Sequence, residues 1–198
     1  MMLILASQSA ARRAMLTAAG VPHEILAAHV DEDAITAGLH AEAASPERIA
    51  DALAEVKALK ISRQHPGALV LGADTVAVTA SGLLINKPET RARAEAQLRQ
   101  LAGSSHRLVS AAVICEGGRP VWRAAGVSTL VMRKLSNEFI AAYLDAEGEP
   151  VLGCAGCYRI EALGAQLFTR IDGDQFTIRG LPLLAVLDYL RTRGVLPA

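Results

Sequence analysis

The sequence has few aromatic residues and no excess of either charge. Phe, Trp and Tyr make up 4% of the 198 residues, and Lys plus Arg number 20, as do Asp plus Glu. Proteins that bind nucleic acid usually carry a basic face with interleaved aromatic side chains, and this composition supplies neither. We therefore expect no nucleic-acid partner. A small charged ligand is compatible with the sequence, because charged side chains can cluster locally while the total charge is zero.

The sequence also lacks a long apolar run and a set of cysteines suited to disulfides. No segment reaches the length needed to cross a bilayer. The apolar start of the chain is followed by Arg12 and Arg13, whereas a secretory signal places its positive charge first. Cys115, Cys154 and Cys157 form an odd and sparse set that is typical of a reducing compartment. These absences predict a cytoplasmic protein without a membrane partner.

Apolar residues, at 52%, are numerous enough for one substantial core. Short apolar segments alternate with segments that carry helix start and stop signals, so we expect one α/β unit. No repeat, low-complexity tract or linker interrupts residues 1–198, which predicts a single domain. The expected strands span residues 3–6, 23–27, 69–78, 83–86, 105–115, 121–132 and 166–171; the expected helices span 10–19, 90–101, 136–144 and 182–193, and a longer one opens at Ser45-Pro46-Glu47.

A carboxylate interrupts the most apolar of these segments, Leu69–Val78. Asp74 lies among Leu, Val, Ala and Gly residues that predict a buried strand. Burying a carboxylate is costly unless it is paired, binds a metal or takes part in chemistry. An Asp near the end of a strand can instead cap a turn. From this residue alone, both interpretations stay open.

A turn near the start of the chain could bind phosphate. Ser7-Gln8-Ser9 lies between an expected strand and an expected helix, and Arg12 and Arg13 follow in the first turn of that helix. Such a turn directs free backbone N–H groups and the positive end of the helix dipole toward one point. The same residues also fit an ordinary capped helix with exposed arginines.

Three further charged residues are candidates for a site, and two of them have two interpretations each. Lys57 lies on the flank of an apolar helical stripe, where a lysine can extend to water or point into a cleft. Lys87 precedes Pro88, which fixes its backbone in an extended form. Glu32 belongs to the acidic stretch Val30–Asp33, which predicts a solvated loop, although its carboxylate could reach a metal.

Cys154-Ala155-Gly156-Cys157 has the spacing of a redox motif. The segment lacks the strand context of a thioredoxin-like protein, and together with Cys115 it supplies too few ligands for a structural zinc site. We interpret the two cysteines as small buried side chains. A redox protein remains the alternative.

Eight stretches of the chain, taken in order, resemble the Maf-type nucleoside triphosphate pyrophosphatases, a family associated with septum formation and with removal of unwanted nucleotides. The resemblance covers nearly the whole chain. It implies an α/β fold in which a mixed sheet and two lobes flank a deep cleft, as in the inosine triphosphate pyrophosphatases. The matching stretches are Leu5–Ser9 with Arg12-Arg13, Val30–Glu32, Leu53–Ala58, Gly72–Val76, Lys87-Pro88, Leu101–His106, Ala155–Tyr158 and Gly180–Leu183.

The resemblance also implies a reaction and roles for particular residues. A nucleoside triphosphate and water would give the monophosphate and pyrophosphate, with Mg²⁺ or Mn²⁺ as cofactor. Asp74 matches the catalytic carboxylate, and Glu32 matches an acidic residue that helps with metal or water. The positions that match triphosphate ligands are Ser7, Arg12, Arg13, Lys57 and Lys87. A homodimer is a candidate assembly, and a nucleotide-binding regulator of cell division without turnover is the alternative function.

The base preference expected from the resemblance is mixed. The dTTP/UTP subtype carries Arg, Thr and Gln at the positions of Ala11, Thr75 and Glu161, and the 7-methyl-GTP subtype carries Trp, Gln and Glu. Glu161 only accepts hydrogen bonds and suits the two donors of a guanine edge. Ala11 removes the aromatic face that would stack on a methylated, cationic base, and Thr75 matches the pyrimidine subtype. We expect a triphosphate substrate, with a lean toward guanine-like or modified bases.

Overall fold

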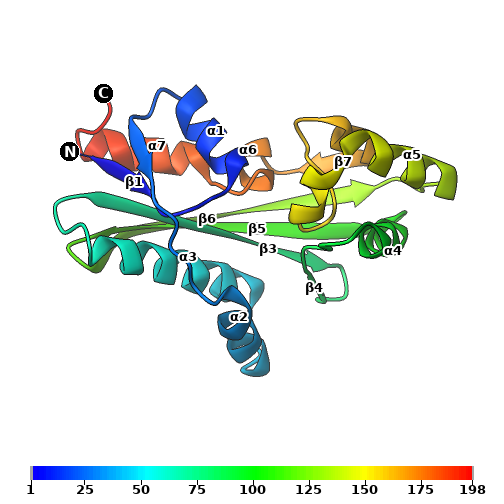
Figure 1. Ribbon diagram of the computed structural model, residues 1–198, viewed down its shortest axis with the longest axis horizontal. Helices are drawn as coiled ribbons and strands as arrows, with labels where there is room; N and C mark the ends of the chain where they lie inside the picture. The colour runs from blue at the N-terminus through cyan, green and yellow to red at the C-terminus, as the bar shows by residue number, and fades with distance from the viewer. Residues whose placement is uncertain (1, 198) are drawn as a thin grey trace. The chain divides into compact units, whose positions relative to one another are not determined.

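The computed structural model describes residues 2–197, and its central feature is a mixed β-sheet (Figure 1). The strands are β1 (Leu3–Leu5), β2 (His23–Ile25), β3 (Leu69–Thr79), β4 (Leu84–Ile85), β5 (Ser105–Glu116), β6 (Arg119–Met132) and β7 (Phe168–Asp172). Over these residues the strand order is β2-β1-β3-β5-β6-β7, with β4 paired to β3. β1 runs parallel to β2 and β3, whereas β4 and β7 run antiparallel to their partners. The expected α/β class and mixed sheet are confirmed.

The helices begin where capping residues predict. The α-helices of the described residues are α1 (Ala10–Ala18), α2 (Glu32–Ala41), α3 (Pro46–Ser62), α4 (Arg91–Leu101), α5 (Asn137–Glu147), α6 (Gln175–Ile178) and α7 (Leu183–Thr192), and the 3₁₀ helices are η1 (Glu149–Gly153) and η2 (Leu163–Leu167). Four of the α-helices start after a hydroxyl side chain that accepts a backbone N–H bond three residues later, from Ser9, Ser45, Thr90 and Ser136. Because this bond satisfies a donor that the helix itself leaves free, it fixes the first turn.

Two short helices were not expected. The acidic stretch at residues 30–33, interpreted as a solvated loop, is the start of α2. Asp31 caps this helix by accepting the backbone N–H of Ala34 at 3.0 Å. Acidic residues in a first turn interact favourably with the helix dipole, so the charges that indicated a loop fit a helix N-terminus equally well. α6 begins at Gln175, directly after the expected turn Asp172-Gly173-Asp174 that follows β7.

The chain forms two compact units, each built from separate segments. Unit 1 contains the chain up to Thr75, Val109–Gly126 and the chain from Arg179 onward. Unit 2 contains Val76–Leu108 and Val127–Ile178. Within residues 2–197, no helix has both the length and the apolar character needed to cross a membrane.

In unit 1, α3 packs directly on β3 at Gly72. A Cβ atom at this position would overlap the carbonyl oxygen of Ala54 and would lie 2.8 Å from the backbone nitrogen of Ala58. The helix backbone therefore touches the strand backbone. Only glycine permits this approach, and Lys57 lies on the part of α3 that is brought closest to β3.

We expect Gly72→Ala to lower the free energy of unfolding by about 1–3 kcal/mol, because α3 must move away from β3 to make room for the methyl group. Urea unfolding followed by circular dichroism measures this loss. Gly67→Ala is the matched control, since a Cβ there meets nothing within 4 Å, and its effect should stay within about 0.5 kcal/mol. Equal stability of the two variants would contradict the close contact.

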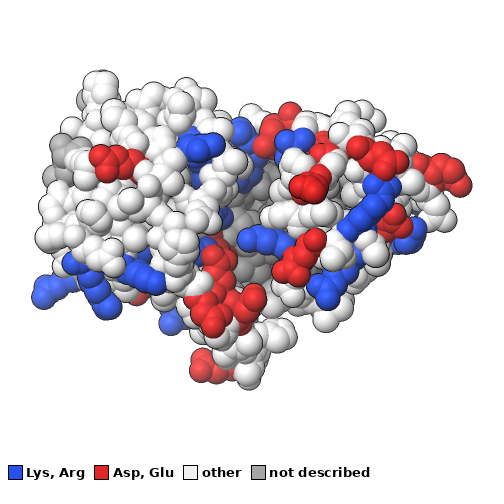
Figure 2. Space-filling view, viewed as in Figure 1, with Lys and Arg blue, Asp and Glu red and all other residues white. Residues whose placement is uncertain are grey.

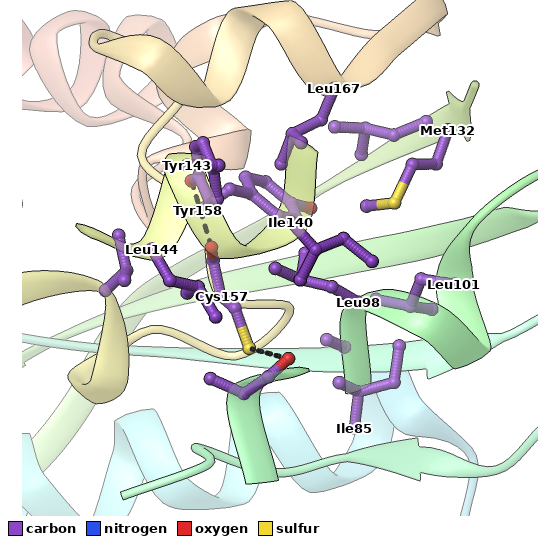
Figure 3. Packing of buried hydrophobic residues seen from close by; sticks show 14 of the residues in the cluster. Ile85, Leu98, Leu101, Met132, Ile140, Tyr143, Leu144, Cys157, Tyr158 and Leu167 are labelled. Atoms are coloured by element: carbon purple, nitrogen blue, oxygen red, sulfur yellow. Dashed lines mark hydrogen bonds between the residues drawn. The ribbon is translucent and has the colours of Figure 1, made fainter. Parts of the chain in front are cut away.

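The core of unit 2 gathers around Tyr143, Cys157 and Tyr158 (Figure 3). The Tyr143 hydroxyl donates to the Cys157 carbonyl at 3.0 Å, and the Cys157 sulfur lies 3.8 Å from the Ala94 carbonyl oxygen. Burial, with a smaller effect of Cys154, raises the pKa of Cys157 to about 12. A protonated thiol is a poor nucleophile, which supports the interpretation of Cys157 as a small buried side chain over that of a redox group.

Candidate functional site

In unit 1, the carboxylates of Asp74 and Glu32 both contact the ammonium group of Lys57. Its Nζ atom lies 2.6 Å from Asp74 Oδ1 and 2.8 Å from Glu32 Oε1. Lys57 comes from the buried face of α3, Asp74 from β3 and Glu32 from the first turn of α2. The side chains of Lys57 and Asp74 are 7% and 10% exposed, whereas that of Glu32 is 43% exposed. This charged triad is therefore buried at Asp74 and open to solvent at Glu32.

The packing of α3 on β3 explains why Lys57 points inward. Gly72 and Asp74 are two residues apart on β3 and so face the same side of the sheet. Gly72 brings the α3 backbone close, and Lys57 then reaches Asp74 instead of water. The ammonium group compensates the buried carboxylate, which would otherwise be strongly unfavourable. Acidic side chains also gather over α2, the helix that carries Glu32 (Figure 2).

Arg12 is a second buried cation of unit 1, with 8% of its surface exposed. Its Nε donates to the Gly180 carbonyl at 2.7 Å, Nη1 donates to Ser7 Oγ at 3.2 Å, and Nη2 donates to Thr75 Oγ1 at 3.1 Å. All three acceptors are uncharged. A guanidinium has five N–H donors, so the contacts made within residues 2–197 leave two donors for a ligand.

The charge of Arg12 is retained despite its burial. Burial lowers the pKa of Arg12, and the nearby charges of Asp74 and Glu32 act in the opposite direction. Arginine remains protonated in proteins even when its pKa is lowered. A buried guanidinium whose three hydrogen-bond acceptors are neutral is suited to bind an anion.

The turn before α1 has the geometry expected of an anion site. Ser9 caps α1 by accepting the N–H of Arg12, and Ser7 Oγ accepts both the Ser9 N–H and one Arg12 donor. Ser7 is buried, whereas Arg13 is exposed on the next position of the helix. Both arginines were predicted as phosphate ligands from the sequence, but their surroundings differ. Arg12 points into unit 1, and Arg13 points to solvent.

Two of the residues expected to read the base also lie in unit 1. Ala11 is half-buried in the first turn of α1. The hydroxyl of Thr75 is bonded to Arg12 at 3.1 Å and lies 2.8 Å from Ser110 Oγ. The contacts of Ser110 and Gly180 were not found from the sequence. Gly180 belongs to a stretch that matched the family, but no spacing rule connects it to residue 12.

Lys87 and Glu161, the other two predicted site residues, lie in unit 2. Both are exposed and occupy loops. The pKa of the Cys154 thiol is raised mainly by burial and further by Glu161, while Arg159 and Lys87 lower it. The charges of Lys87 and Glu161 thus both act on the same thiol.

Gln97 of α4 joins the two loops of unit 2 that flank these residues. Its Nε2 donates to the Asn86 carbonyl at 2.9 Å, one residue before Lys87. Its Oε1 accepts the Gly156 N–H at 3.1 Å and the Cys157 thiol at 2.8 Å. Sequence reasoning missed this contact because a glutamine on a helix carries no signal for a loop partner.

The donor set of unit 1 fits a magnesium-like cation. Among residues 2–197 no three His, Cys, Asp or Glu side chains are grouped as a metal site. Asp74 and Glu32 instead supply two carboxylates that converge on one point, the ammonium group of Lys57. Mg²⁺ is usually held by one or two carboxylates together with substrate phosphates and water. Asp74 and Glu32 match the carboxylate part of that set, and the ammonium group of Lys57 occupies the point between them.

Comparison with known proteins gives matches over the full length of the chain. The family model described as Maf-like protein matches residues 2–193. A nucleoside triphosphate pyrophosphatase of Sphingopyxis alaskensis is 49% identical over 197 residues, which cover 100% of each chain. Proteins of the same name from Roseobacter denitrificans and Caulobacter vibrioides are 49% and 47% identical, covering 98% and 97% of this chain and 98% and 96% of their own. The similarity therefore includes both units.

Proposed function

The chain belongs to the Maf-like family of nucleoside triphosphate pyrophosphatases, hydrolases of phosphoanhydride bonds, and we propose that Asp74 is the residue of this chain around which the reaction is built. Water attacks the α-phosphorus of a nucleoside triphosphate, and the products are the monophosphate and pyrophosphate. The observation that supports this assignment is the buried Asp74, which Lys57 holds beside Glu32. Arg12, with two N–H donors left for an anion, lies in the same unit.

The first requirement of the reaction is to stabilise negative charge. The triphosphate is a polyanion, and the leaving pyrophosphate gains charge as the bond breaks. Fixed cations in a partly dry site lower the energy of such a transition state. In this proposal Arg12 and the N-terminus of α1, with Ser7, bind the phosphates, and Arg13, Lys57 and Lys87 complete the set.

The second requirement is to activate water. Asp74 accepts the proton of the attacking water, and Glu32 assists it. A divalent cation, Mg²⁺ or Mn²⁺, would be held by Asp74 and Glu32, and when bound it supplies charge neutralisation on phosphate oxygens and a lower pKa for bound water. Lys57 keeps the two carboxylates together, at 2.6 Å and 2.8 Å from its ammonium group.

The proposed preference for guanine-like or modified bases rests on Glu161. Such a preference would suit an enzyme that removes modified or non-standard nucleotides. An acceptor-only carboxylate fits two donors of a guanine-like base, whereas a glutamine fits the alternating edge of uracil or thymine. A link to cell-division arrest follows from the family association alone.

One experiment tests both the reaction and the base preference. We expect the purified protein with magnesium to release pyrophosphate and monophosphate in equal amounts from a panel of dTTP, UTP, 5-methyl-UTP, CTP and 7-methyl-GTP. Glu161→Gln should raise kcat/KM for dTTP and UTP relative to kcat/KM for 7-methyl-GTP by about tenfold, because a carboxylate acceptor is lost. Enzyme-coupled detection of pyrophosphate gives the rates, and chromatography identifies the monophosphate.

Glu149→Gln is the matched control, because Glu149 is another exposed glutamate of unit 2 and is not among the predicted site residues. Its ratios should equal those of the wild type. Binding of nucleotides without pyrophosphate release would favour a regulator over an enzyme. Exclusive turnover of dTTP and UTP by the wild type would contradict the role given to Glu161.

A further inference from the structure

We propose that Thr75, Ser110 and the backbone carbonyl of Gly180 form a tether that holds the Arg12 guanidinium in position for the triphosphate. The proposal rests on the proposed function of Arg12 as a phosphate ligand and adds the residues that orient it. The tether residues are positioning residues, since they act through Arg12. In this proposal Thr75, which was expected to help read the base, serves the part of the substrate that all nucleotides share.

The hydroxyl part of the tether connects two neighbouring strands to Arg12. Thr75 on β3 accepts from Arg12 Nη2 at 3.1 Å, and its oxygen lies 2.8 Å from Ser110 Oγ on β5. Ser110 is fully buried, at 0% exposure. A hydroxyl with two fixed partners loses its freedom to rotate. The Thr75 oxygen is therefore held in one orientation, and the arginine fork is held with it.

The carbonyl part of the tether depends on glycine. Gly180 has a φ angle of +102°, which side chains other than glycine rarely adopt. A Cβ atom there would lie 3.1 Å from Thr75 Oγ1 and 3.2 Å from both Nε and Nη2 of Arg12. The absence of a side chain thus lets the Gly180 carbonyl reach Arg12 Nε at 2.7 Å. This explains why a glycine precedes Leu181-Pro182-Leu183.

The electrostatic advantage of this tether is that all its groups are neutral. A carboxylate could orient the guanidinium as well, but it would also neutralise the charge that the phosphates require. The Thr75 hydroxyl and the Gly180 carbonyl orient the fork and leave its charge intact, and the Ser7 hydroxyl, which is not part of the tether, is a third neutral acceptor. Because a small misplacement of a binding group can cost a large factor in rate, such fixed orientation matters for catalysis.

The test measures phosphate binding without a base. Inorganic pyrophosphate is titrated by calorimetry into wild type, Thr75→Val and Ser110→Ala, each in magnesium buffer. We expect the dissociation constant to rise about 10- to 100-fold for Thr75→Val, which loses a hydrogen bond to a charged group, and about 3- to 10-fold for Ser110→Ala. KM values for the nucleotide panel should rise by one common factor in each variant.

Rescue and coupling separate positioning from general damage to the fold. Thr75→Ser keeps the hydroxyl and should bind pyrophosphate as the wild type does. Ser62→Ala removes another fully buried hydroxyl of unit 1, at 0% exposure and bonded to the Gly118 N–H, and should leave the dissociation constant unchanged. In a double-mutant cycle, Thr75→Val should add almost nothing to Arg12→Lys, because both changes remove one function.

The outcomes distinguish the tether from the proposed function. If Arg12→Lys binds pyrophosphate as tightly as the wild type, Arg12 is not a phosphate ligand, and both the tether and the phosphate-binding role proposed for Arg12 are wrong. If Arg12→Lys weakens binding while Thr75→Val and Ser110→Ala do not, only the tether is overturned. Factors that differ from one base to another in Thr75→Val would also overturn it, since they would assign Thr75 to base recognition.

Discussion

Asp74→Asn should lower kcat by about 10²- to 10⁴-fold, the usual range for loss of a general base, while the protein remains folded. The amide has nearly the shape of the carboxylate but does not take a proton from water. The charge of Lys57 is not left unpaired in the variant, because Glu32 lies 2.8 Å from its ammonium group. Pyrophosphate release under saturating nucleotide and magnesium measures kcat, and thermal unfolding checks the fold.

Asp51→Asn is the appropriate control for this change. Asp51 lies on α3 in the same unit and pairs with Arg123 at 2.6 Å, away from the charged triad. Its kcat should match the wild type within experimental error. A folded Asp74→Asn protein with nearly wild-type turnover would refute the assignment of Asp74 as the catalytic carboxylate.

Lys57→Met should destabilise the protein by about 3–5 kcal/mol in the presence of EDTA, the range observed when one partner of a buried ion pair is removed. Methionine has a similar length, so the main loss is the ammonium group between Asp74 and Glu32. Most of the effect should come from Asp74, because the 43% exposed Glu32 is screened by water. Urea unfolding gives the free energy.

Magnesium should restore part of this stability in Lys57→Met, because a ligand that binds only the folded state stabilises it. The two carboxylates keep their charge in this variant without the ammonium group, so a bound cation compensates both of them. Lys60→Met, one turn further on α3 at an exposed position, should lose less than about 1 kcal/mol. If the two variants lose equally, the triad is not a buried ion pair; if magnesium has no effect on Lys57→Met, Asp74 and Glu32 do not bind the metal.

Local signals in the sequence predicted most of the fold. Capping residues such as Ser45 and Thr90 mark helix starts with side chains that are adjacent in sequence to the groups they satisfy. The apolar segment around Asp74 predicted β3 almost to its ends, Leu69–Thr79. α2 was missed because three consecutive acidic residues fit both a solvated loop and a helix N-terminus, and the structure shows that Asp31 caps a helix there.

The site was predicted less completely, because its contacts join distant segments. Helical spacing placed Lys57 at the edge of an apolar stripe but could not show that Gly72 draws α3 close enough for Lys57 to reach Asp74. The sequence likewise predicted the same phosphate-binding role for Arg12 and Arg13. Their difference depends on the Gly180 carbonyl, which no local pattern connects to residue 12.

The bond from Arg12 to the Gly180 carbonyl spans 168 residues and has a consequence for protein synthesis. At typical elongation rates, roughly ten to thirty seconds pass between the translation of Arg12 and that of Gly180. Throughout that time, Arg12 of the nascent chain lacks the Gly180 carbonyl as a hydrogen-bond acceptor. Polypeptides in which Gly180 has not yet been translated therefore hold this cation without its full set of neutral partners, and the guanidinium acquires the last of them only when that glycine is available.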